Sequence, residues 1–384
     1  MPVETLSIST RPASKNNLWI EIHLDRLLHN LDQLKVKVRP YTRVMAVIKA
    51  NAYGHGLVPV AQALQGKVDF LGIGSLKEAS ILREQGITAP LFLFGRLFQD
   101  EVPIALQMNL TLTVSSLEEA QHISEASLGH SKRKKTPIHI KVDTGMGRLG
   151  IPLRFAPAEI EKISGLPALE LEGIYTHFPT AEKYPDSFTV NQLDQFEQLI
   201  QALRRKDISF ALRHAANSAG ALCFQSTALN LVRPGIALYG IHPHPLLARE
   251  IDLEPVLCLK SRIAFLKQIQ TGESIGYGRE FIATEPTTIA TLPIGYAHGY
   301  PVHLSGKGEA IVKGRKVRQV GRVCMDSMML NLGLQTDAAV GDEVTLLGES
   351  GDERLSAQEL ATLAGTIPYE IVTRLDATIP RLYL

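Results

Sequence analysis

The stretch AVIKANAYGHG, residues 46–56, places a lysine directly after an apolar run and before a series of small residues. An isolated lysine at the end of a strand is usually a surface residue, with its aliphatic stem packed and its ammonium group in water. A lysine that faces a pocket has a different use, because its amine can form a Schiff base with an aldehyde. The positions of the other polar residues decide between these two interpretations of Lys49.

Polar residues that are able to do chemistry recur at the ends of apolar runs. Besides Lys49 they are the segment 143–148, His177, Asn217 with Ser218, and Arg233 with Gly235 and Ile236. In a barrel of parallel strands, catalytic groups lie at the carboxyl ends of the strands, and a phosphate site often follows the last two strands. We therefore expect Ser218 and the amides of Gly235 and Ile236 to bind a phosphate. A lysine opposite such a site is suited to hold pyridoxal phosphate by its aldehyde.

The elements that must position these residues are short apolar runs that alternate with helical patterns. Eight runs occur, at 43–49, 69–74, 90–94, 110–114, 137–143, 169–177, 210–214 and 231–239. Near-continuous apolar strands separated by helices indicate a parallel sheet covered by helices. Eight such units match the size of a (β/α)₈ TIM-type barrel. An open doubly wound sheet is the alternative.

The chain divides into two regions, because a helical spacing of apolar residues gives way to strand-like segments. Apolar residues three or four apart predict one apolar helix face from Val190, Leu193, Phe196, Ile200 and Leu203, and a helix before the first run from Leu27, Leu28, Leu31 and Leu34. After about residue 255, strand-like segments separated by glycine-rich turns take over, and a capping box at Ser356 and Glu359 predicts one late helix. We expect an α/β barrel domain over 1–255, with 1–16 a loose tail, followed by a mostly β domain over 256–384.

Composition indicates a globular protein that acts on a small molecule. Apolar residues make up 45% of the chain, and 40 basic against 39 acidic residues give a net charge of +1, so neither a nucleic-acid nor a membrane partner is expected. Three scattered cysteines suit a reducing compartment, and no apolar run reaches the 18 residues of a membrane span, which predicts a cytoplasmic protein. The histidines of HPHP, 242–245, lack acidic or thiol neighbours, so no metal site is expected.

Seven motifs together resemble alanine racemase, in order and with suitable separations: AVIKANAYGHG, KVDTGMGRLG, HAANSAG, RPGIALYG, SIGYGREF, PIGYAHGYP and VGRVCMD. The resemblance extends over nearly the whole chain. It implies a pyridoxal 5'-phosphate enzyme of fold type III, in which a barrel is followed by a β domain and two chains form a head-to-tail homodimer. The implied reaction interconverts L-alanine and D-alanine, which supplies D-alanine for peptidoglycan or degrades it.

The resemblance implies two bases, one for each face of the substrate carbon. Lys49 would hold the cofactor and then serve one face, and Tyr277 of the other chain would serve the opposite face. A free phenol titrates near 10, so Tyr277 needs support, which the resemblance places in His177 and Arg233. Arg233 would also face the ring nitrogen of the cofactor. Because an arginine does not give up its proton, it should leave the ring a weaker electron sink and suppress side reactions.

Further roles are implied for the residues around these bases. Tyr53 and Tyr369 would add phosphate contacts to those of Ser218, Gly235 and Ile236. Arg148 would contact the phenolic oxygen of the cofactor and the substrate carboxylate, and Lys141 matches a position that can carry a carbamate to orient that arginine. The Met325 amide would bind the substrate carboxylate, and Tyr296 would narrow the access to the site.

Two departures from the family pattern and three alternatives stay open at this point. His298 stands where the family commonly has aspartate, and Pro179 where alanine is usual. A fold-type III decarboxylase is one alternative, against which Arg233 argues, since those enzymes usually carry an acid there. A racemase of broader specificity for serine or larger amino acids is the second. The third is a non-catalytic pyridoxal-phosphate carrier, which would not need the β domain that bears Tyr277.

Overall fold

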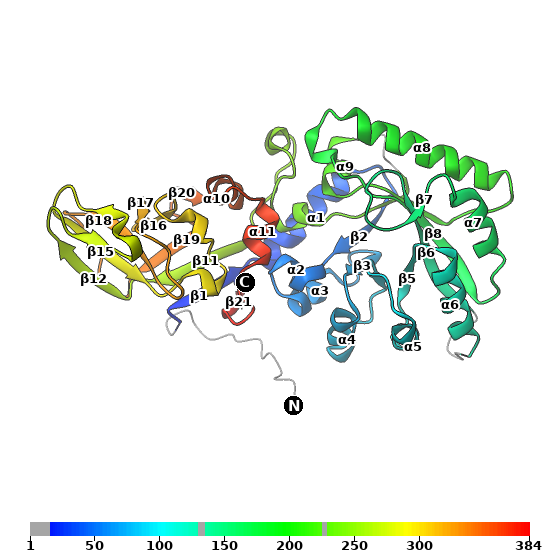
Figure 1. The fold of residues 1–384 in the computed structure, drawn as a ribbon, viewed down its shortest axis with the longest axis horizontal. Helices are drawn as coiled ribbons and strands as arrows, with labels where there is room; N and C mark the ends of the chain where they lie inside the picture. Colours follow the sequence, from blue (N-terminus) through cyan, green and yellow to red (C-terminus); the bar gives the residue numbers. More distant parts are fainter. Residues whose placement is uncertain (1–15, 130–134, 225–228) are drawn as a thin grey trace. The chain divides into compact units, whose positions relative to one another are not determined.

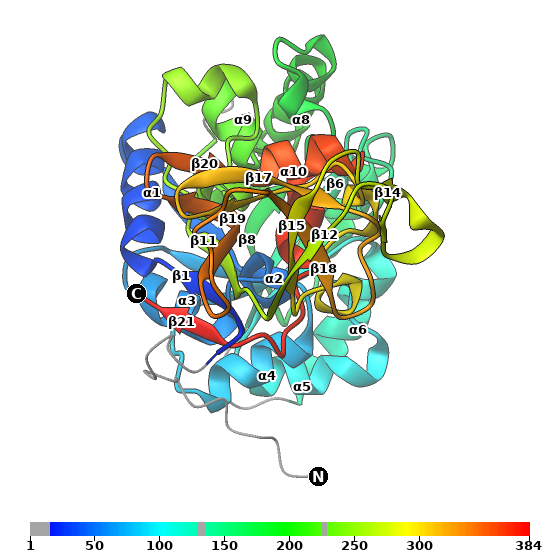
Figure 2. The same ribbon diagram turned by 90° about the vertical axis from the view of Figure 1, so that its left-hand side faces the viewer.

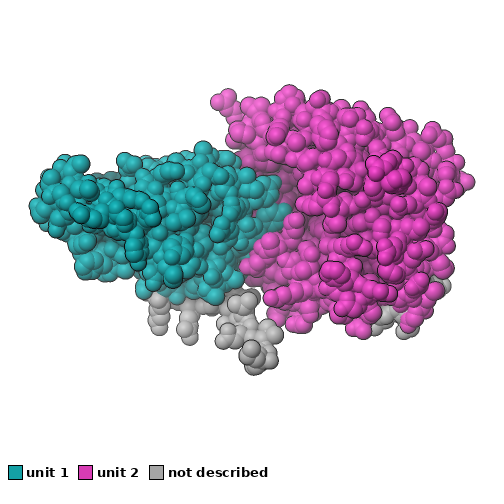
Figure 3. Space-filling model, in the orientation of Figure 1, with its two compact units in different colours: residues 1–27, 53–56, 254–384 teal, residues 28–52, 57–253 magenta. Residues whose placement is uncertain are grey.

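The computed structural model describes residues 16–129, 135–224 and 229–384, so the tail expected over 1–16 lies almost entirely outside the described residues. The chain forms two compact units, which Figure 3 shows in different colours. Unit 1 contains the residues up to 27, the short segment 53–56 and residues 254–384, and unit 2 contains 28–52 and 57–253. No helix among the described residues is both long enough and apolar enough to cross a bilayer.

Unit 2 is a nearly closed barrel of parallel strands with helices on its outside (Figure 1). The strands lie in the order β10 (Leu231–Val232), β2 (Arg43–Val47), β3 (Phe70–Ile73), β4 (Leu91–Leu93), β5 (Thr111–Val114), β6 (Thr136–Asp143), β8 (Leu169–Tyr175) and β9 (Leu212–His214), and β7 (Ile151–Pro152) pairs with β6. In the described part of the chain no ladder joins β9 to β10, so the barrel stays open at one seam. The predicted (β/α)₈ barrel is confirmed.

Helices alternate with the strands along the chain of unit 2, and the first of them begins in unit 1. They are α1 (Leu24–Lys37), α3 (Leu57–Leu64), α4 (Leu76–Glu84), α5 (Val102–Gln107), α6 (Leu117–Leu128), α7 (Ala156–Ser164), α8 (Ser187–Arg204) and α9 (Ser218–Cys223). Serine or acidic caps start several of them, as Ser75 does for α4 and Asp186 for α8. Inside the barrel, large side chains from the strands pack together: Met45, Phe70, Phe92, Tyr175, Leu212 and Leu231.

The apolar face of α8 is rotated from the predicted one. Val190 is 46% exposed and Ile200 only half-buried. The buried face consists of Thr189, Gln192, Leu193, Phe196, Leu199 and Leu203. The rotation has a polar cause, because Asp186 accepts the Thr189 amide at 2.9 Å and Gln192 Nε2 donates to Thr144 Oγ1 at 3.1 Å. Two polar residues therefore occupy positions that apolar periodicity alone assigns to the solvent side.

A left-handed turn follows the first barrel strand. The element α2 (Lys49–Tyr53) has φ values of 54°, 55° and 52° at Ala50, Asn51 and Ala52, and Tyr53 has φ 54°. Each L-residue in this region costs about 1–2 kcal/mol. Hydrogen bonds hold the turn, since Ala52 N donates to Ile48 O at 2.8 Å and Ala50 N to Glu78 Oε1 at 2.7 Å. The sequence predicts only a loop of small residues here.

Unit 1 is built on a mostly antiparallel sheet, and Figure 2 labels many of its strands. Its order is β12 (Phe265–Ile269), β15 (Thr287–Leu292), β18 (Met328–Gly333), β17 (Arg315–Val320), β16 (Glu309–Val312), β19 (Glu343–Ser350), β11 (Leu257–Arg262), β1 (Leu18–Ile22) and β21 (Arg381–Tyr383), with β20 (Glu353–Leu355) on β19. A separate hairpin joins β13 (Ser274–Ile275) to β14 (Phe281–Ile282). The mostly β character predicted for the C-terminal region is confirmed.

Two segments of unit 1 come from outside residues 254–384, namely the N-terminal segment with β1 and the short segment 53–56. Strand β1 pairs with β11 in an antiparallel ladder and with β21 in a parallel one, although the sequence analysis placed residues 18–22 in the range of the barrel. Two helices complete the unit, α10 (Ala357–Ala364) and α11 (Pro368–Thr373). The capping box predicted at Ser356 is present, with its hydroxyl and the Glu359 carboxylate each accepting a backbone amide.

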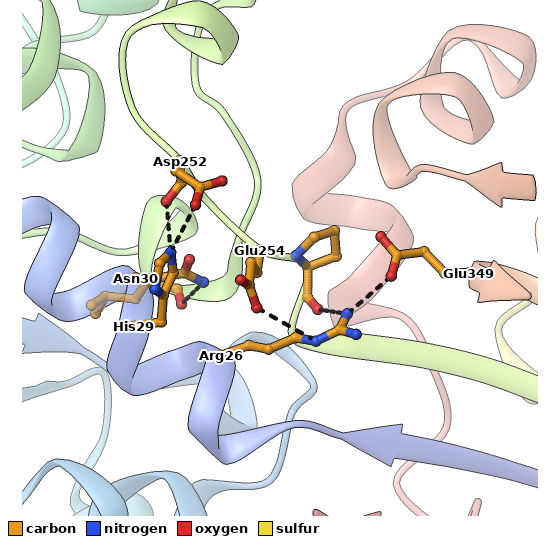
Figure 4. Close-up of polar contacts among 8 residues, drawn as sticks. Arg26, His29, Asn30, Asp252, Glu254 and Glu349 are labelled. Atoms are coloured by element: carbon orange, nitrogen blue, oxygen red, sulfur yellow. Dashed lines mark hydrogen bonds and ion pairs between the residues drawn. The ribbon is translucent and has the colours of Figure 1, made fainter. Parts of the chain in front are cut away.

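Helix α1 begins in unit 1 and continues in unit 2, and side chains fix both parts (Figure 4). In unit 1, Arg26 lies between two carboxylates, 3.7 Å from Glu254 and 3.3 Å from Glu349. In unit 2, His29 Nε2 lies 3.3 Å from Asp252 Oδ2 and 3.2 Å from the Asp252 carbonyl oxygen. The side chains of each part of α1 therefore contact residues of the unit to which that part belongs.

The close packing around Gly54 gives a test of the segment 53–56. A Cβ on Gly54, where φ is +83°, would lie 2.1 Å from the carbonyl oxygen of Val372. Gly66 has a similar φ of +77° but nothing within 4 Å of the corresponding position. Gly66→Ala should therefore cost only the left-handed penalty of about 1–2 kcal/mol, and Gly54→Ala about 1–3 kcal/mol more. Urea unfolding of both variants measures the difference, and equal losses would contradict the described contact.

Candidate active site

Five predicted site residues lie together at the mouth of the barrel in unit 2. They are Lys49, Lys141, Arg148, His177 and Arg233, and their charges act on one another. Lys49, His177 and Arg233 follow β2, β8 and β10, respectively. Lys141 lies in β6 and Arg148 in the loop after it, so four strands of the parallel barrel contribute. Four of the five are cations at neutral pH, so the mouth carries a positive potential that favours an anionic ligand.

The Lys49 amine is poised to act as a nucleophile or a base. Its pKa lies below the ordinary lysine value because the side chain is buried and because Arg148 repels its charge, although Glu78 opposes the shift. Glu78 also fixes the backbone after β2 and after β3, since its carboxylate accepts the Ala50 and Gly74 amides at 2.7 Å each. A lower pKa increases the fraction of neutral amine, which is the form that reacts with a carbonyl group.

The loop after β6 presents Arg148. Asp143 accepts the amides of Gly145 and Gly147, at 2.9 Å and 3.1 Å, and so folds the loop back on the strand. Gly150 has φ +123°, and a Cβ there would lie 2.9 Å from the Asp143 nitrogen, so the return requires glycine. Within the strand, burial and then the charges of Arg148 and Arg233 lower the pKa of Lys141 to about 8.

Arg233 is a buried guanidinium surrounded by hydrogen-bond acceptors. It is 3% exposed, and burial lowers its pKa to about 10. Its Nη2 donates to the carbonyl oxygens of Thr176 and Ala215, both at 2.8 Å, and its Nη1 lies 2.8 Å from His214 Nδ1. Arginine presents five N–H donors and no acceptor, so it does not share a proton with a ligand nitrogen. It offers only a donated hydrogen bond.

His177 is neutral at pH 7 and has one defined tautomer. Burial, followed by the charges of Arg233 and Arg148, lowers its pKa well below the ordinary value. Its Nδ1 lies 3.2 Å from Arg233 Nη2, whose two protons are also donated to two carbonyl oxygens, so Nδ1 shares one of these protons as an acceptor. The single ring proton is therefore on Nε2, which can donate to a phenolate or another acceptor.

The predicted phosphate cradle is partly preorganised. Ser218 Oγ accepts the amides of Gly235 and Ala237, at 2.9 Å and 3.3 Å. A hydroxyl has two acceptor lone pairs and one proton, so the Ser218 proton is the part left to bind an anion. The Ile236 amide donates to no other described residue, whereas the Gly235 amide, expected to bind phosphate, is already used by Ser218.

Tyr53 and Tyr369 lie together in unit 1, as the resemblance implied for two phosphate ligands. Their ring centroids are 6.1 Å apart. Burial, and secondarily Tyr369, raises the pKa of Tyr53 above its ordinary value, so its hydroxyl keeps its proton and can donate. The backbone of this segment is held by Arg381, whose Nε donates to the Gly54 carbonyl oxygen at 2.9 Å.

Tyr277 lies at the tip of the β13–β14 hairpin of unit 1. Gly276 and Gly278, with φ of +73° and +72°, flank it, and its side chain is 71% exposed. An ion pair of 2.5 Å between Arg322 and Glu280 holds the base of this tip. The hairpin therefore presents a phenol away from the unit 1 core.

Tyr296 and Met325 form a second exposed group in unit 1. The amides of Tyr296 and Ala297 donate to the carbonyl oxygens of Cys324 and Met325, at 3.0 Å and 2.9 Å. This close approach leaves no room for a side chain at residue 295, which is glycine. The Met325 amide donates to no other described residue, so it can bind a carboxylate. His298, the departure noted above, turns inward and its Nδ1 accepts the residue 295 amide at 3.2 Å.

Several polar residues inside the barrel were not predicted from the sequence. Tyr175 lies beneath the cations, with Arg233 and Lys141 at 5.3 Å and 5.6 Å from its ring centroid, and His139 and His214 are fully buried. The signal was present in the strand 136–143, where His139, Lys141 and Asp143 alternate with isoleucine and valine. Polar residues at a period of two in an otherwise apolar barrel strand all point to one face.

Pyridoxal phosphate, the cofactor that the resemblance implies, fits the residues present. Its phosphate would neutralise part of an excess of positive charge, and the Ser218 hydroxyl and the Ile236 amide offer donors to it. Lys49 supplies an amine of lowered pKa for its aldehyde. The chemistry of the donor set therefore agrees with this group.

Comparisons with known proteins agree over nearly the whole chain. The sequence model of the alanine racemase N-terminal domain matches residues 22–243, and that of the C-terminal domain matches 256–383. The alanine racemase of Desulforamulus reducens is 42% identical over 96% of this chain and 100% of its own, and that of Methanococcus maripaludis is 39% identical over 96% and 98%. The solved alanine racemase of Clostridium difficile 630 has a TM-score of 0.89 at 36% identity, covering 96% of both chains. The Bacillus anthracis enzyme with bound L-Ala-P has the same TM-score and identity, over 97% and 96%.

The lowered pKa of Lys141 predicts a pH-dependent stability. Between its folded pKa of about 8 and its ordinary value of 10.5, the unfolded chain binds more protons at this residue. The free energy of unfolding should therefore rise with pH through this window. Lys141→Met, in cofactor-free protein and carbon-dioxide-free buffer, should be stabilised relative to wild type near pH 8, and the difference should shrink toward pH 10.5. Urea unfolding measures it, exposed Lys307→Met is the control, and a constant difference would contradict the burial of a charged Lys141.

Proposed function

This chain belongs to the alanine racemase family, and we propose that it interconverts L-alanine and D-alanine with pyridoxal 5'-phosphate as its cofactor. The reaction is an isomerisation. When bound, the cofactor supplies an electron-withdrawing system that delocalises the negative charge left when the substrate Cα loses its proton. The observation that supports the proposal most strongly is Lys49, an amine of lowered pKa at a barrel mouth where four cations gather.

The barrel residues hold the cofactor and serve one face of the substrate. Lys49 would bind the aldehyde, and Ser218 and Ile236 would bind the phosphate together with Tyr53 and Tyr369. Arg148 and Arg233 would contact the phenolic oxygen and the ring nitrogen. On this face the Lys49 amine would take or give the Cα proton. The charge of Arg148, which lowers the Lys49 pKa, favours the neutral basic form.

Tyr277 of the partner subunit serves the opposite face. A free phenol has a pKa near 10, so at neutral pH almost none of it is the basic phenolate. A donated hydrogen bond stabilises the phenolate and makes it available. His177 has that donor, because Arg233 occupies its Nδ1 and leaves the proton on Nε2. Arg233 thus supports the second base through one neutral imidazole, without giving up its own proton.

A homodimer gives the exposed tip of unit 1 its function. Tyr277, Ile282, Tyr296 and Met325 are 71%, 52%, 45% and 59% exposed in the single chain. Several large apolar side chains exposed on one unit favour a surface that another chain covers. The Met325 amide would then bind the substrate carboxylate together with Arg148, and Tyr296 would narrow the access to a small substrate.

Lys141 has the environment that a carbamate requires. Its pKa of about 8 leaves a fraction of neutral amine near pH 7, which is the form that reacts with carbon dioxide. The anionic product would pair with Arg148 and Arg233, whose charges now repel the ammonium group. The modification would orient Arg148 toward the cofactor.

The cellular setting belongs to the same proposal. All three cysteines are free thiols, as a reducing cytoplasm would keep them. D-Alanine made there would serve as a precursor for peptidoglycan, and a catabolic role would run the same reaction in the other direction.

A chiral assay of the protein loaded with pyridoxal phosphate tests the reaction. Either enantiomer of alanine should be converted to an equal mixture, because the two have the same free energy in water. Serine should react more slowly if Tyr296 and Met325 narrow the site. Release of carbon dioxide from the amino acid would favour the decarboxylase alternative. Absence of any conversion by a loaded protein would reject the proposal.

Complementation between two inactive variants tests the shared site. Lys49→Ala and Tyr277→Phe should each be nearly inactive, because each lacks one base in every site. Refolded together in equal amounts, they should form about half heterodimers, each with one intact site, and recover about a quarter of the wild-type activity. Lys49→Ala mixed with the Lys49→Ala/Tyr277→Phe double variant is the matched control, since it never forms an intact site. No recovery, with heterodimers confirmed by tags, would mean that both bases belong to one chain.

A further inference from the structure

A chain of buried side chains runs from Arg233 into the barrel interior. Arg233 Nη1 lies 2.8 Å from His214 Nδ1, and His214 Nε2 lies 2.8 Å from His139 Nδ1. His139 Nε2 then lies 3.1 Å from Glu172 Oε2. The members come from β9, β6 and β8 and from the segment after β10, so the chain joins separate strands of the barrel.

The hydrogen bonds of this chain have only one consistent direction. Because Arg233 donates and never accepts, His214 Nδ1 must accept, and the His214 proton is on Nε2. That proton is donated to His139 Nδ1, so the His139 proton is also on Nε2. The last acceptor is the carboxylate of Glu172, which suits an N–H donor. The arginine at one end and the carboxylate at the other therefore both require the ring proton of each histidine to be on Nε2.

The surroundings favour neutral imidazoles in fixed positions. Both histidines are 0% exposed, and burial lowers the pKa of each. Tyr175 stacks on His214 at 4.8 Å with a 4° angle between the rings, and Phe92 lies 4.8 Å from the His139 ring. Gly173 makes room for His139, because a Cβ there would lie 2.7 Å from the ring.

We propose that Glu172 and His139 are positioning residues for Arg233, acting through His214. By keeping the His214 Nδ1 lone pair aimed at Nη1, they hold the guanidinium in one orientation and so keep Nη2 on His177. If the arrangement reversed, an N–H of His214 would face an N–H of Arg233, and the guanidinium would have to turn away. The consequence for catalysis rests on the proposed function, in which Arg233 faces the cofactor ring and His177 supports Tyr277.

Nitrogen NMR of the histidine rings tests the direction without cofactor or substrate. In ¹⁵N-histidine-labelled, cofactor-free protein at pH 7, His139 and His214 should each show a protonated Nε2 and an unprotonated Nδ1. Single His139→Asn and His214→Asn variants assign the signals. A protonated Nδ1 in either ring, or a doubly protonated ring, would overturn the proposal, whatever reaction the enzyme catalyses.

Two near-isosteric variants at residue 139 separate positioning from packing. In His139→Asn, Oδ1 takes the place of Nδ1 as the acceptor for His214, whereas His139→Leu removes that acceptor and suits the apolar pocket around Phe92. Positioning predicts that the Leu variant loses roughly 10- to 100-fold in kcat and gains transamination relative to racemisation, while Asn retains most of both properties. Packing alone predicts the reverse order. Leu equal to or better than Asn would overturn the role of His139.

A matched pair at the other end tests Glu172, which is partly exposed and so tolerates substitution. Glu172→Gln keeps an oxygen acceptor for His139, and Glu172→Met removes it at similar length. Gln should preserve the ring nitrogen shifts of His139 and the ratio of racemisation to transamination, and Met should change both in a protein with unaltered thermal unfolding. Identical shifts and ratios in the two variants would exclude Glu172 from the chain.

Discussion

The buried guanidinium of Arg233 constrains most of the polar structure in the barrel. Because it only donates, every neighbour must accept, and the neighbours found are the carbonyl oxygens of Thr176 and Ala215 and one nitrogen each of His177 and His214. No carboxylate among the described residues contacts it. The positive charge is therefore stabilised by the dipoles of neutral acceptors. It also fixes the ring protons of two neutral histidines, His177 and His214. Toward the mouth it leaves a donor on His177, and toward the interior it orders the path to Glu172.

The mouth of the barrel also concentrates positive charge in a way that opposes folding. Besides burial, the charge of Arg148 lowers the pKa of Lys49 and of Lys141, and all three cations lower that of His177. The compensating carboxylates Glu78 and Asp143 accept mainly backbone amides. Such self-repulsion reduces the stability of the cofactor-free protein, and a bound phosphate relieves it. The same charges that weaken the fold thus increase the affinity for an anion, as is common in sites selected for activity.

The sequence predicted the architecture because eight apolar runs alternate with helical patterns, and it predicted the site because polar residues lie at the strand ends. The barrel, the β-rich region and the helix capped at Ser356 are confirmed, and Lys49, Lys141, Arg148, His177 and Arg233 lie together, while their individual roles remain predictions. Features set by long-range hydrogen bonds were missed. The rotation of α8 depends on Gln192 reaching Thr144, and the path to Glu172 depends on side chains from β6, β8 and β9 meeting inside the barrel. Neither has a local signature beyond alternating polar residues.

The left-handed turn after Lys49 bears on the order in which the protein folds. Four consecutive residues in this region, 50–53, cost roughly 4–8 kcal/mol together, an appreciable part of the stability of a typical domain. A short peptide of this sequence would therefore avoid the native conformation, and only contacts with distant groups such as Glu78 make it favourable. The segment is thus expected to form late, after β3 and α4 have placed that carboxylate. Until then the amine of Lys49 has no fixed direction, so a partly folded chain lacks the means to capture its cofactor selectively.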